Sequence, residues 1–137
     1  YGDKIKRMAE ELGVIDRIAF TGAVKYQDLS RYISAMDIGL NPLKMMKKND
    51  LTVGGKVFNY LSCGRPVLSS RMVSLERLLE DEIYYYDDVE SFVEQVEMIL
   101  RARPDGQRYR SLAEKYDWKC IAKDAQESIE SFERSHK

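Results

Sequence analysis

The sequence has few of the residues on which disulfide frameworks and metal centres are built. Its 137 residues contain two cysteines, Cys63 and Cys120, far apart in the chain, and a single histidine, His136, in the C-terminal tail. Two distant thiols do not make a disulfide framework, so we expect reduced cysteines, as in the cytoplasm. One histidine in a tail argues against a catalytic triad and against zinc-like spacing. We therefore predict no metal site.

Long apolar runs and an excess of charge are also missing. No stretch approaches the roughly 18 apolar residues of a spanning helix. The 22 basic and 23 acidic residues nearly cancel, which gives no case for nucleic-acid binding. Neither GxxxxGK[ST] nor GxGxxG is present, and no internal repeat is seen. The remaining composition, 44% hydrophobic and 33% charged, is that of one globular domain over residues 1–137.

Apolar periodicity predicts short strands that alternate with helices. Strands are expected at 17–21, 37–43, 66–70 and 83–86, and helices at 3–12, 27–35, 56–63, 74–80, 91–102, 105–116 and 118–132. Such alternation indicates βαβ crossovers, hence an α/β fold with a Rossmann-like parallel sheet and flanking helices. The C-terminal region, 89–133, is predicted to be helical throughout.

Three smaller expectations concern single side chains. Ser74 is placed to cap the helix at 74–80, and the pair Asp87-Asp88, which on paper resembles a metal-binding pair, is placed to cap the helix that follows it. Alternate rings of the run Tyr84–Tyr86 should be buried, as in a strand. Trp118 is expected to anchor the last helix in the core.

The one long polar loop, KMMKKNDLTVGG at 44–55, is the candidate ligand site. It follows a predicted strand and ends in Gly54-Gly55, directly before a helix that begins with Lys56. Free N–H groups and the helix dipole favour an anion there, and glycine lets a ligand approach the backbone. The alternative is plain: a glycine pair is often only a turn, and a lysine run is often a solvated loop.

Three stretches in order resemble the donor-binding region of retaining, GT-B-fold glycosyltransferases of the family 4 type. They are FTGAVKYQDLSRYISAMDIGLNPL, KVFNYLSCGRPVLSS and the Tyr116-Asp117-Trp118 start of the last helix. The resemblance covers about residues 2 to 133. It implies the C-terminal, nucleotide-sugar-binding domain of such an enzyme, with a second domain for the acceptor and no cofactor beyond a UDP- or GDP-linked sugar as substrate.

The resemblance also implies roles for particular residues. In the family a helix Glu binds the ribose hydroxyls, and Asn59 stands at that position; an amide can still bond hydroxyls, but without charge assistance. No acid occupies the position of the family's other Glu, near Leu51, although Asp50 is adjacent. The full set of implied substrate-binding residues is Gly22 for the base, Leu51 and Thr52 for the sugar, Gly54, Gly55 and Lys56 for the diphosphate, and Asn59 for the ribose. No residue suggests itself as a general base.

The same resemblance places the first two strands of the domain, and the whole acceptor domain, before this chain. The two strands would lie between 17–21 and 37–43, so open sheet edges and self-association are expected. The chain by itself is then expected to be inactive, and to lie in the cytoplasm or at the inner face of a membrane. Two alternatives stay open: a non-catalytic scaffold or interaction module with a degenerate GT-B fold, and a different α/β nucleotide-binding protein.

Overall fold

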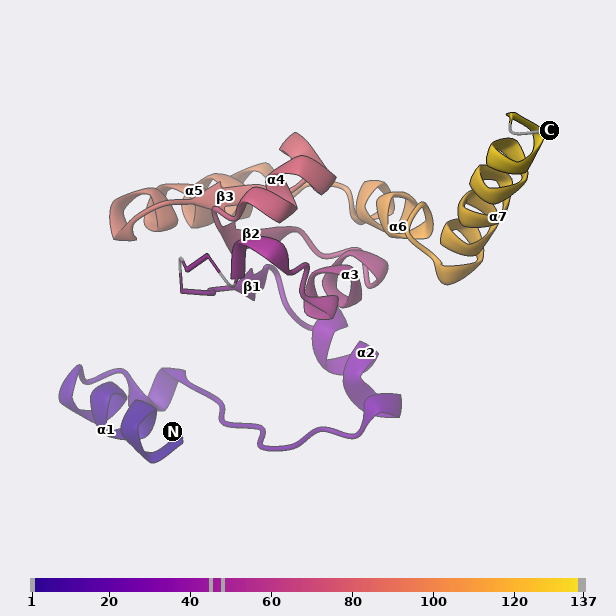
Figure 1. The fold of residues 1–137 in the computed structure, drawn as a ribbon. Helices are drawn as coiled ribbons and strands as arrows, with labels where there is room; N and C mark the ends of the chain where they lie inside the picture. The colour runs from indigo at the N-terminus through magenta and orange to yellow at the C-terminus, as the bar shows by residue number, and fades with distance from the viewer. Residues whose placement is uncertain (1, 45, 48, 136–137) are drawn as a thin grey trace.

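The computed structural model describes residues 2–44, 46–47 and 49–135, which form seven α-helices, three short 3-10 helices and three strands (Figure 1). In chain order the elements are α1 (Gly2–Glu11), η1 (Ile15–Arg17), α2 (Tyr26–Ser34), β1 (Gly39–Asn41), η2 (Asn49–Leu51), α3 (Gly55–Ser62), β2 (Val67–Ser70), α4 (Val73–Leu79), η3 (Glu80–Glu82), β3 (Tyr84–Tyr86), α5 (Val89–Ala102), α6 (Gly106–Glu114) and α7 (Trp118–Ser135). His136 lies outside the described residues. The predicted order of helices is confirmed.

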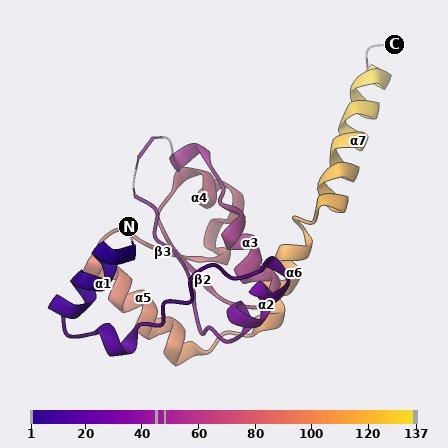
Figure 2. The same cartoon turned by 90° about the horizontal axis from the view of Figure 1, so that it is seen from below.

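The three strands form one parallel sheet in the order β1-β2-β3. Leu40 pairs with Leu68, and Leu68 pairs in turn with Tyr84. All four residues of β2 are buried, because strands flank it on both sides and Figure 2 shows helices α3 and α4 on one side of the strands and α5 on the other. Burial on both faces is typical of a parallel α/β sheet, so the predicted fold class is confirmed.

The core lies between the sheet and the helices α3, α4 and α6. Its buried members are Val57, Leu61, Val67, Met72, Leu75, Leu79, Ile83, Tyr109 and Leu112. The helix residues recur at three or four positions, as Val57 and Leu61 do in α3, which puts them on one face of each helix. This packing fixes α3 against the sheet and α6.

Two glycines let backbones and rings approach where a side chain would collide. In β1, a Cβ on Gly39 would lie 2.8 Å from the Cβ of Tyr60 and would overlap its ring. Gly64, at φ +71°, ends α3 in a Schellman motif: its N–H bonds the carbonyl of Leu61, and the N–H of Arg65 bonds that of Tyr60. The predicted stop at Gly64 is therefore confirmed with its mechanism.

The predicted strand at 17–21 is wrong. Arg17 ends η1, and Ile18 has extended angles (φ −114°, ψ 120°) but pairs with no described strand. The connection from η1 to α2 runs apart from the sheet in Figure 1. Extended backbone becomes a strand only when a neighbour accepts and donates its hydrogen bonds. The expected neighbours, two strands between this segment and β1, are not among the described elements.

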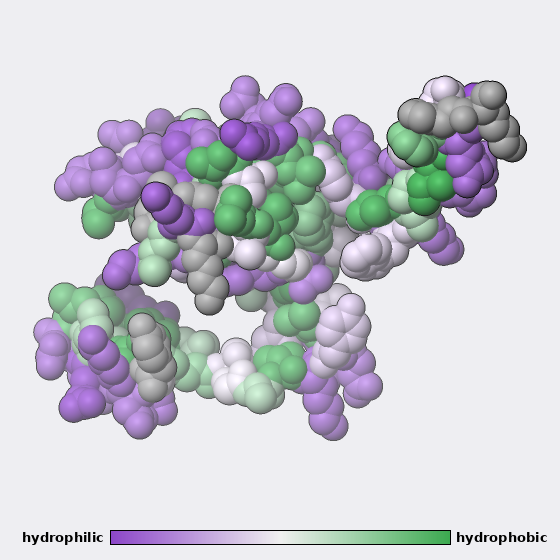
Figure 3. Space-filling model, in the orientation of Figure 1, coloured by the Kyte–Doolittle hydropathy of each residue, from purple (hydrophilic) through white to green (hydrophobic). Residues whose placement is uncertain are grey.

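Two expectations about aromatic residues are also wrong. All three tyrosines of β3 are half-buried, with no alternation, because each ring finds a packing partner: Tyr84 and Tyr85 pack against the core, and the Tyr86 ring packs edge-to-face on Phe92 of α5, 5.1 Å away. Trp118 is 82% exposed, since α7 projects from the rest of the fold (Figures 1 and 2). Figure 3 shows hydrophobic side chains on the surface of α7.

No helix within the described part of the chain is both long and apolar enough to cross a bilayer. α7 has the necessary length of 18 residues, but polar and charged residues alternate with its apolar ones. Its surface is therefore that of an amphipathic helix rather than of a spanning segment.

Candidate functional site

The amino end of α3 is free of any competing side chain. Gly54, the N-cap, is extended (φ −70°, ψ 129°) and offers no side-chain cap, and its carbonyl accepts the N–H of Val57 at 3.1 Å. The first turn contains no acidic residue. A helix start leaves several N–H groups without intrahelical partners. Positive potential therefore faces outward at Gly55 and Lys56.

Open space adjoins this helix start. A Cβ built on Gly54 or on Gly55 meets no atom within 4 Å. The glycines are thus not required by crowding inside the protein, and their conformations lie at negative φ or in the helix. Glycine here leaves the backbone uncovered, which is the arrangement that lets a phosphate reach main-chain N–H groups.

The described residues of the loop between β1 and α3 are held by side-chain hydrogen bonds. The Asn49 side chain donates to the carbonyl of Lys44 at 2.7 Å, and the Thr52 hydroxyl donates to the carbonyl of Asn49 at 3.0 Å. The Ser74 hydroxyl donates to the carbonyl of Thr52 at 3.0 Å. The expectation that Ser74 caps α4 is therefore wrong, since α4 begins at Val73 with Met72 as its N-cap, and Ser74 holds the loop instead.

The residues predicted to bind substrate divide into two groups. Five of them (Thr52, Gly54, Gly55, Lys56 and Asn59) lie along the loop end and the first turns of α3, with Leu51 just before them, 86% exposed. Asn59 stands one turn after Gly55 on the same side, and both line a cavity of about 800 Å³ with Phe58, Tyr116 and Trp118. Asp50 belongs to η2, but its side chain lies outside what is described.

Gly22 is the exception among the predicted residues. It has φ +66° and lies in the connection between η1 and α2, where a Cβ would meet nothing within 4 Å. That connection runs apart from α3 in Figure 1. The described structure does not bring Gly22 to the other six residues, so its role toward a nucleotide base stays a prediction.

A buried polar cluster that the sequence analysis missed joins the carboxyl ends of β1 and β2. The Asn41 amide donates to the Ser69 hydroxyl at 2.9 Å. The Ser70 hydroxyl donates to the carbonyl of Leu43 at 2.8 Å and accepts its N–H at 3.2 Å. Asn41 Oδ1 is buried without a partner among the described residues. The sequence feature that could have revealed this cluster is the presence of polar residues at the ends of otherwise apolar strands. Their hydrogen bonds hold the chain where it leaves β1 for the loop.

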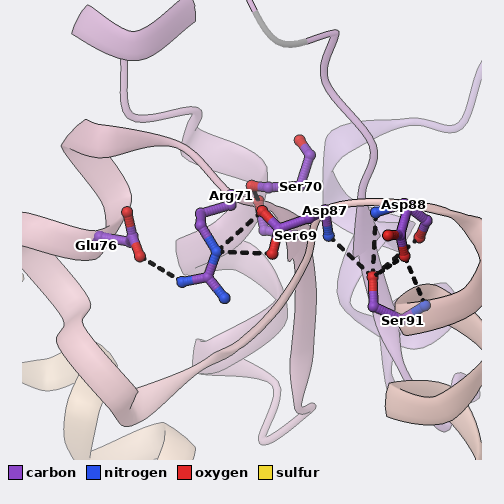
Figure 4. A network of polar contacts seen from close by, with 7 residues as sticks. All are labelled: Ser69, Ser70, Arg71, Glu76, Asp87, Asp88 and Ser91. Atoms are coloured by element: carbon purple, nitrogen blue, oxygen red, sulfur yellow. Dashed lines mark hydrogen bonds and ion pairs between the residues drawn. The ribbon is translucent and has the colours of Figure 1, made fainter.

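Arg71, just after β2, organises the neighbouring edge (Figure 4). Its Nε donates to both carboxylate oxygens of Asp87 at 3.0 Å, and its Nη1 donates to Oε1 of Glu76. These hydrogen bonds, that to Glu76 first, raise the pKa of Arg71 above its ordinary value. The guanidinium also lies 5.4 Å from the Tyr85 ring centroid, and burial raises the pKa of that phenol.

The expectation that the acidic pair before α5 caps this helix is confirmed for Asp88, whereas the carboxylate of Asp87 bonds Arg71 instead. Asp88 caps α5 in a capping box with Ser91, and the hydrogen bonds from Ser91 lower the pKa of Asp88. Asp87 pairs with Arg71. Over the residues that the structure describes, no group of three or more His, Cys, Asp or Glu could hold a metal ion.

Comparison with known proteins gives one family and one curated relative. The model of a family described as glycosyl transferase-like matches residues 2–128. A protein of Bacillus subtilis (strain 168), whose name describes it as a teichuronic acid biosynthesis glycosyltransferase, TuaH, is 25% identical over 118 residues. That match takes in 82% of this chain but 30% of the relative, so the chain spans about a third of the relative's length. No solved structure matches.

Proposed function

This chain belongs to the family of glycosyl transferase-like proteins, and we propose that it forms the donor-binding part of a glycosyltransferase that uses a nucleotide-diphosphate sugar. One observation carries the proposal. The uncapped amino end of α3, with Gly54, Gly55 and Lys56, opens into free space at the carboxyl edge of a parallel sheet. That edge is where α/β sheets of this kind bind their ligands.

The diphosphate of the donor would lie against the start of α3. Main-chain N–H groups at Gly55 and Lys56 would donate to its oxygens, and the Lys56 ammonium would add a positive charge. During transfer the bond between the sugar's anomeric carbon and the diphosphate breaks, and negative charge grows on the departing oxygen. Donors already oriented toward that charge stabilise the transition state more than the ground state.

Asn59 would hold the ribose. It lies one helical turn beyond Gly55 and borders the same cavity, so a nucleotide whose phosphates meet the helix start has its ribose within reach of the amide. The amide both donates to and accepts from hydroxyls. Leu51 and Thr52, before the helix, would border the sugar. We assign no general base and no resident cofactor.

The acceptor would be bound elsewhere, by a separate domain of a longer protein. The match to about a third of the relative's length supports this. The name of that relative concerns teichuronic acid biosynthesis, and on that ground we propose polysaccharide biosynthesis as the setting for this chain. A UDP- or GDP-linked sugar is the donor class that we expect.

Isothermal calorimetry with UDP, GDP and ADP tests the proposal. We expect one nucleotide to bind. Lys56→Ala should lower the affinity for it by about tenfold, which is the effect of losing one charge-assisted contact. Asn59→Ala should weaken UDP or GDP but leave inorganic pyrophosphate unaffected. Lys25→Ala is the matched control, since it removes an exposed lysine at the start of α2.

Two results would contradict the donor-binding proposal. One is a failure of all three nucleotides to bind. The other is binding that Lys56→Ala and Lys25→Ala weaken equally, because the effect would then come from the overall charge and not from the location of Lys56 at the start of α3. An absence of binding to every nucleotide would favour the alternative, a scaffold that keeps the fold but has lost the charged ribose contact.

A further inference from the structure

A second cavity, of about 620 Å³, lies at the opposite edge of the sheet from the amino end of α3. Its walls include Asp37, just before β1, and Pro66, just before β2, so it borders the amino ends of the strands. The eight residues of α3 separate the two sites, by about 12 Å at 1.5 Å per residue. The cavity is therefore not part of the proposed donor site.

Two glycines bring distant parts of the chain together there. A Cβ on Gly64 would lie 2.9 Å from the carbonyl oxygen of Gly106, and a Cβ on Gly106 would lie 2.8 Å from that of Gly64. Only because both residues lack side chains does the turn after α3 touch the start of α6. This contact places Arg65, Arg103 and Arg110 around one cavity.

The three arginines have few partners of their own. None takes part in an ion pair within the described part of the chain. Arg65 donates to the carbonyl of Ser34, yet its Nε is buried and has no described partner. Arg110 donates to the Gln107 side chain at 3.2 Å, and its guanidinium lies against Gly64. Against three guanidinium charges the walls carry one carboxylate, Asp37.

We propose that this cavity binds a phosphate group carried by a small molecule or a lipid headgroup. Guanidinium groups present paired donors that match phosphate oxygens, and several around one cavity suit a dianion. The volume falls within the range of ligand pockets, roughly 300–1,000 Å³. Ile99, Leu100 and Pro104 supply apolar wall for the organic part. The proposal does not depend on the donor site.

The test is a titration of the chain with inorganic phosphate, followed by thermal shift and calorimetry. The phosphate should bind, and the double variant Arg103→Gln/Arg110→Gln should weaken it by at least about tenfold. Arg65 is left unchanged because it donates a hydrogen bond to Ser34 at the end of α2, so replacing it would also disturb that helix. Arg101→Gln is the control: it removes a charge from the last turn of α5, the helix that ends just before Arg103, but Arg101 lies outside the cavity.

Two further arms identify the source of the phosphate. Glycerol phosphate represents a soluble ligand, and vesicles of phosphatidic acid, with phosphatidylcholine vesicles as the blank, represent a headgroup. Binding in either arm that is lost in the double variant supports the proposal and assigns its source. No binding in any arm, or equal weakening by Arg101→Gln, overturns it. UDP titration of the double variant should give the wild-type affinity, so failure here and failure of the donor site are distinguishable.

Discussion

Apolar stripes of the same kind run along the helices from α3 to α6 and along the two terminal helices, α1 and α7. Only the helices from α3 to α6 are packed into the core. Leu61 in α3 and Leu112 in α6 are buried in the core. In α1 only Ala9 is buried, and in α7 no described residue is. Amphipathic periodicity thus predicts where a helix forms, whereas burial depends on a partner surface that periodicity does not specify.

The largest expected effect compares a leucine of α3 with Leu12, the residue directly after α1. Leu61→Ala should lower the free energy of unfolding by about 2–5 kcal/mol, because it leaves a cavity in a fully buried site. Leu12→Ala, where the side chain is 72% exposed, should change it by no more than about 0.5 kcal/mol. Urea denaturation followed by circular dichroism measures both. Equal losses would show that α1 is packed as firmly as α3.

Two of the three described glycines at positive φ, Gly64 and Gly22, distinguish the cost of backbone strain from the cost of crowding. Gly64→Ala should destabilise by about 2 kcal/mol or more, since the left-handed conformation costs roughly 1–2 kcal/mol for a residue with a Cβ and the methyl group also meets Gly106. Gly22→Ala has the same strain but open space around it, so about 1 kcal/mol is expected. The same denaturation assay applies, and the reverse order would contradict the close contact at α6.

The capping box of α5 makes the stability of the protein depend on pH. Hydrogen bonds from Ser91 lower the pKa of Asp88 in the folded state. The stabilisation is therefore fully present above the unfolded pKa of about 3.9 and is lost as pH falls through the lower folded value. Melting temperatures of Asp88→Ala should fall less steeply with acid than those of the wild type. An acid slope for Asp88→Ala equal to that of the wild type would contradict the stabilising role of the capping box.

The smallest effect concerns the ion pair that links α6 to η3. Arg108 and Glu82 lie 2.8 Å apart, and their side chains are 53% and 41% exposed. Solvent screens such a pair, so Glu82→Gln should cost about 0–1 kcal/mol, less still at high salt. Leu112→Ala on the same α6 should cost several-fold more in parallel melts. A larger loss from Glu82→Gln would mean that charge, and not burial, holds α6.

The sequence predicted the helices and the parallel sheet well because each has a local signature. Val57 and Leu61 share a helix face, and Gly64 ends α3 in a left-handed turn that glycine favours. The strand at 17–21 was mispredicted because pairing is not local: Ile18 is extended but lacks a described neighbour. Trp118 was placed in the core on its chemistry alone, and no described element covers it.

The candidate site was predictable in part for the same reason. Gly54, Gly55 and Lys56 are consecutive, so one helix start brings them together whatever the rest of the chain does. Gly22 depends on the packing of the connection between η1 and α2 and does not join them. Asn41 and Ser69 were missed because a strand pairing, distant in sequence, makes their contact.

The most direct test of the donor site is the response of single backbone amides to nucleotide. In ¹⁵N-labelled protein titrated with UDP or GDP, the largest shifts should fall on Gly54, Gly55 and Lys56, with a smaller one on the Asn59 side-chain amide. The amides of Gly64 and Arg65, at the other end of α3, should stay in place. Shifts concentrated at Gly64 and Arg65, or none at the start of α3, would contradict the account.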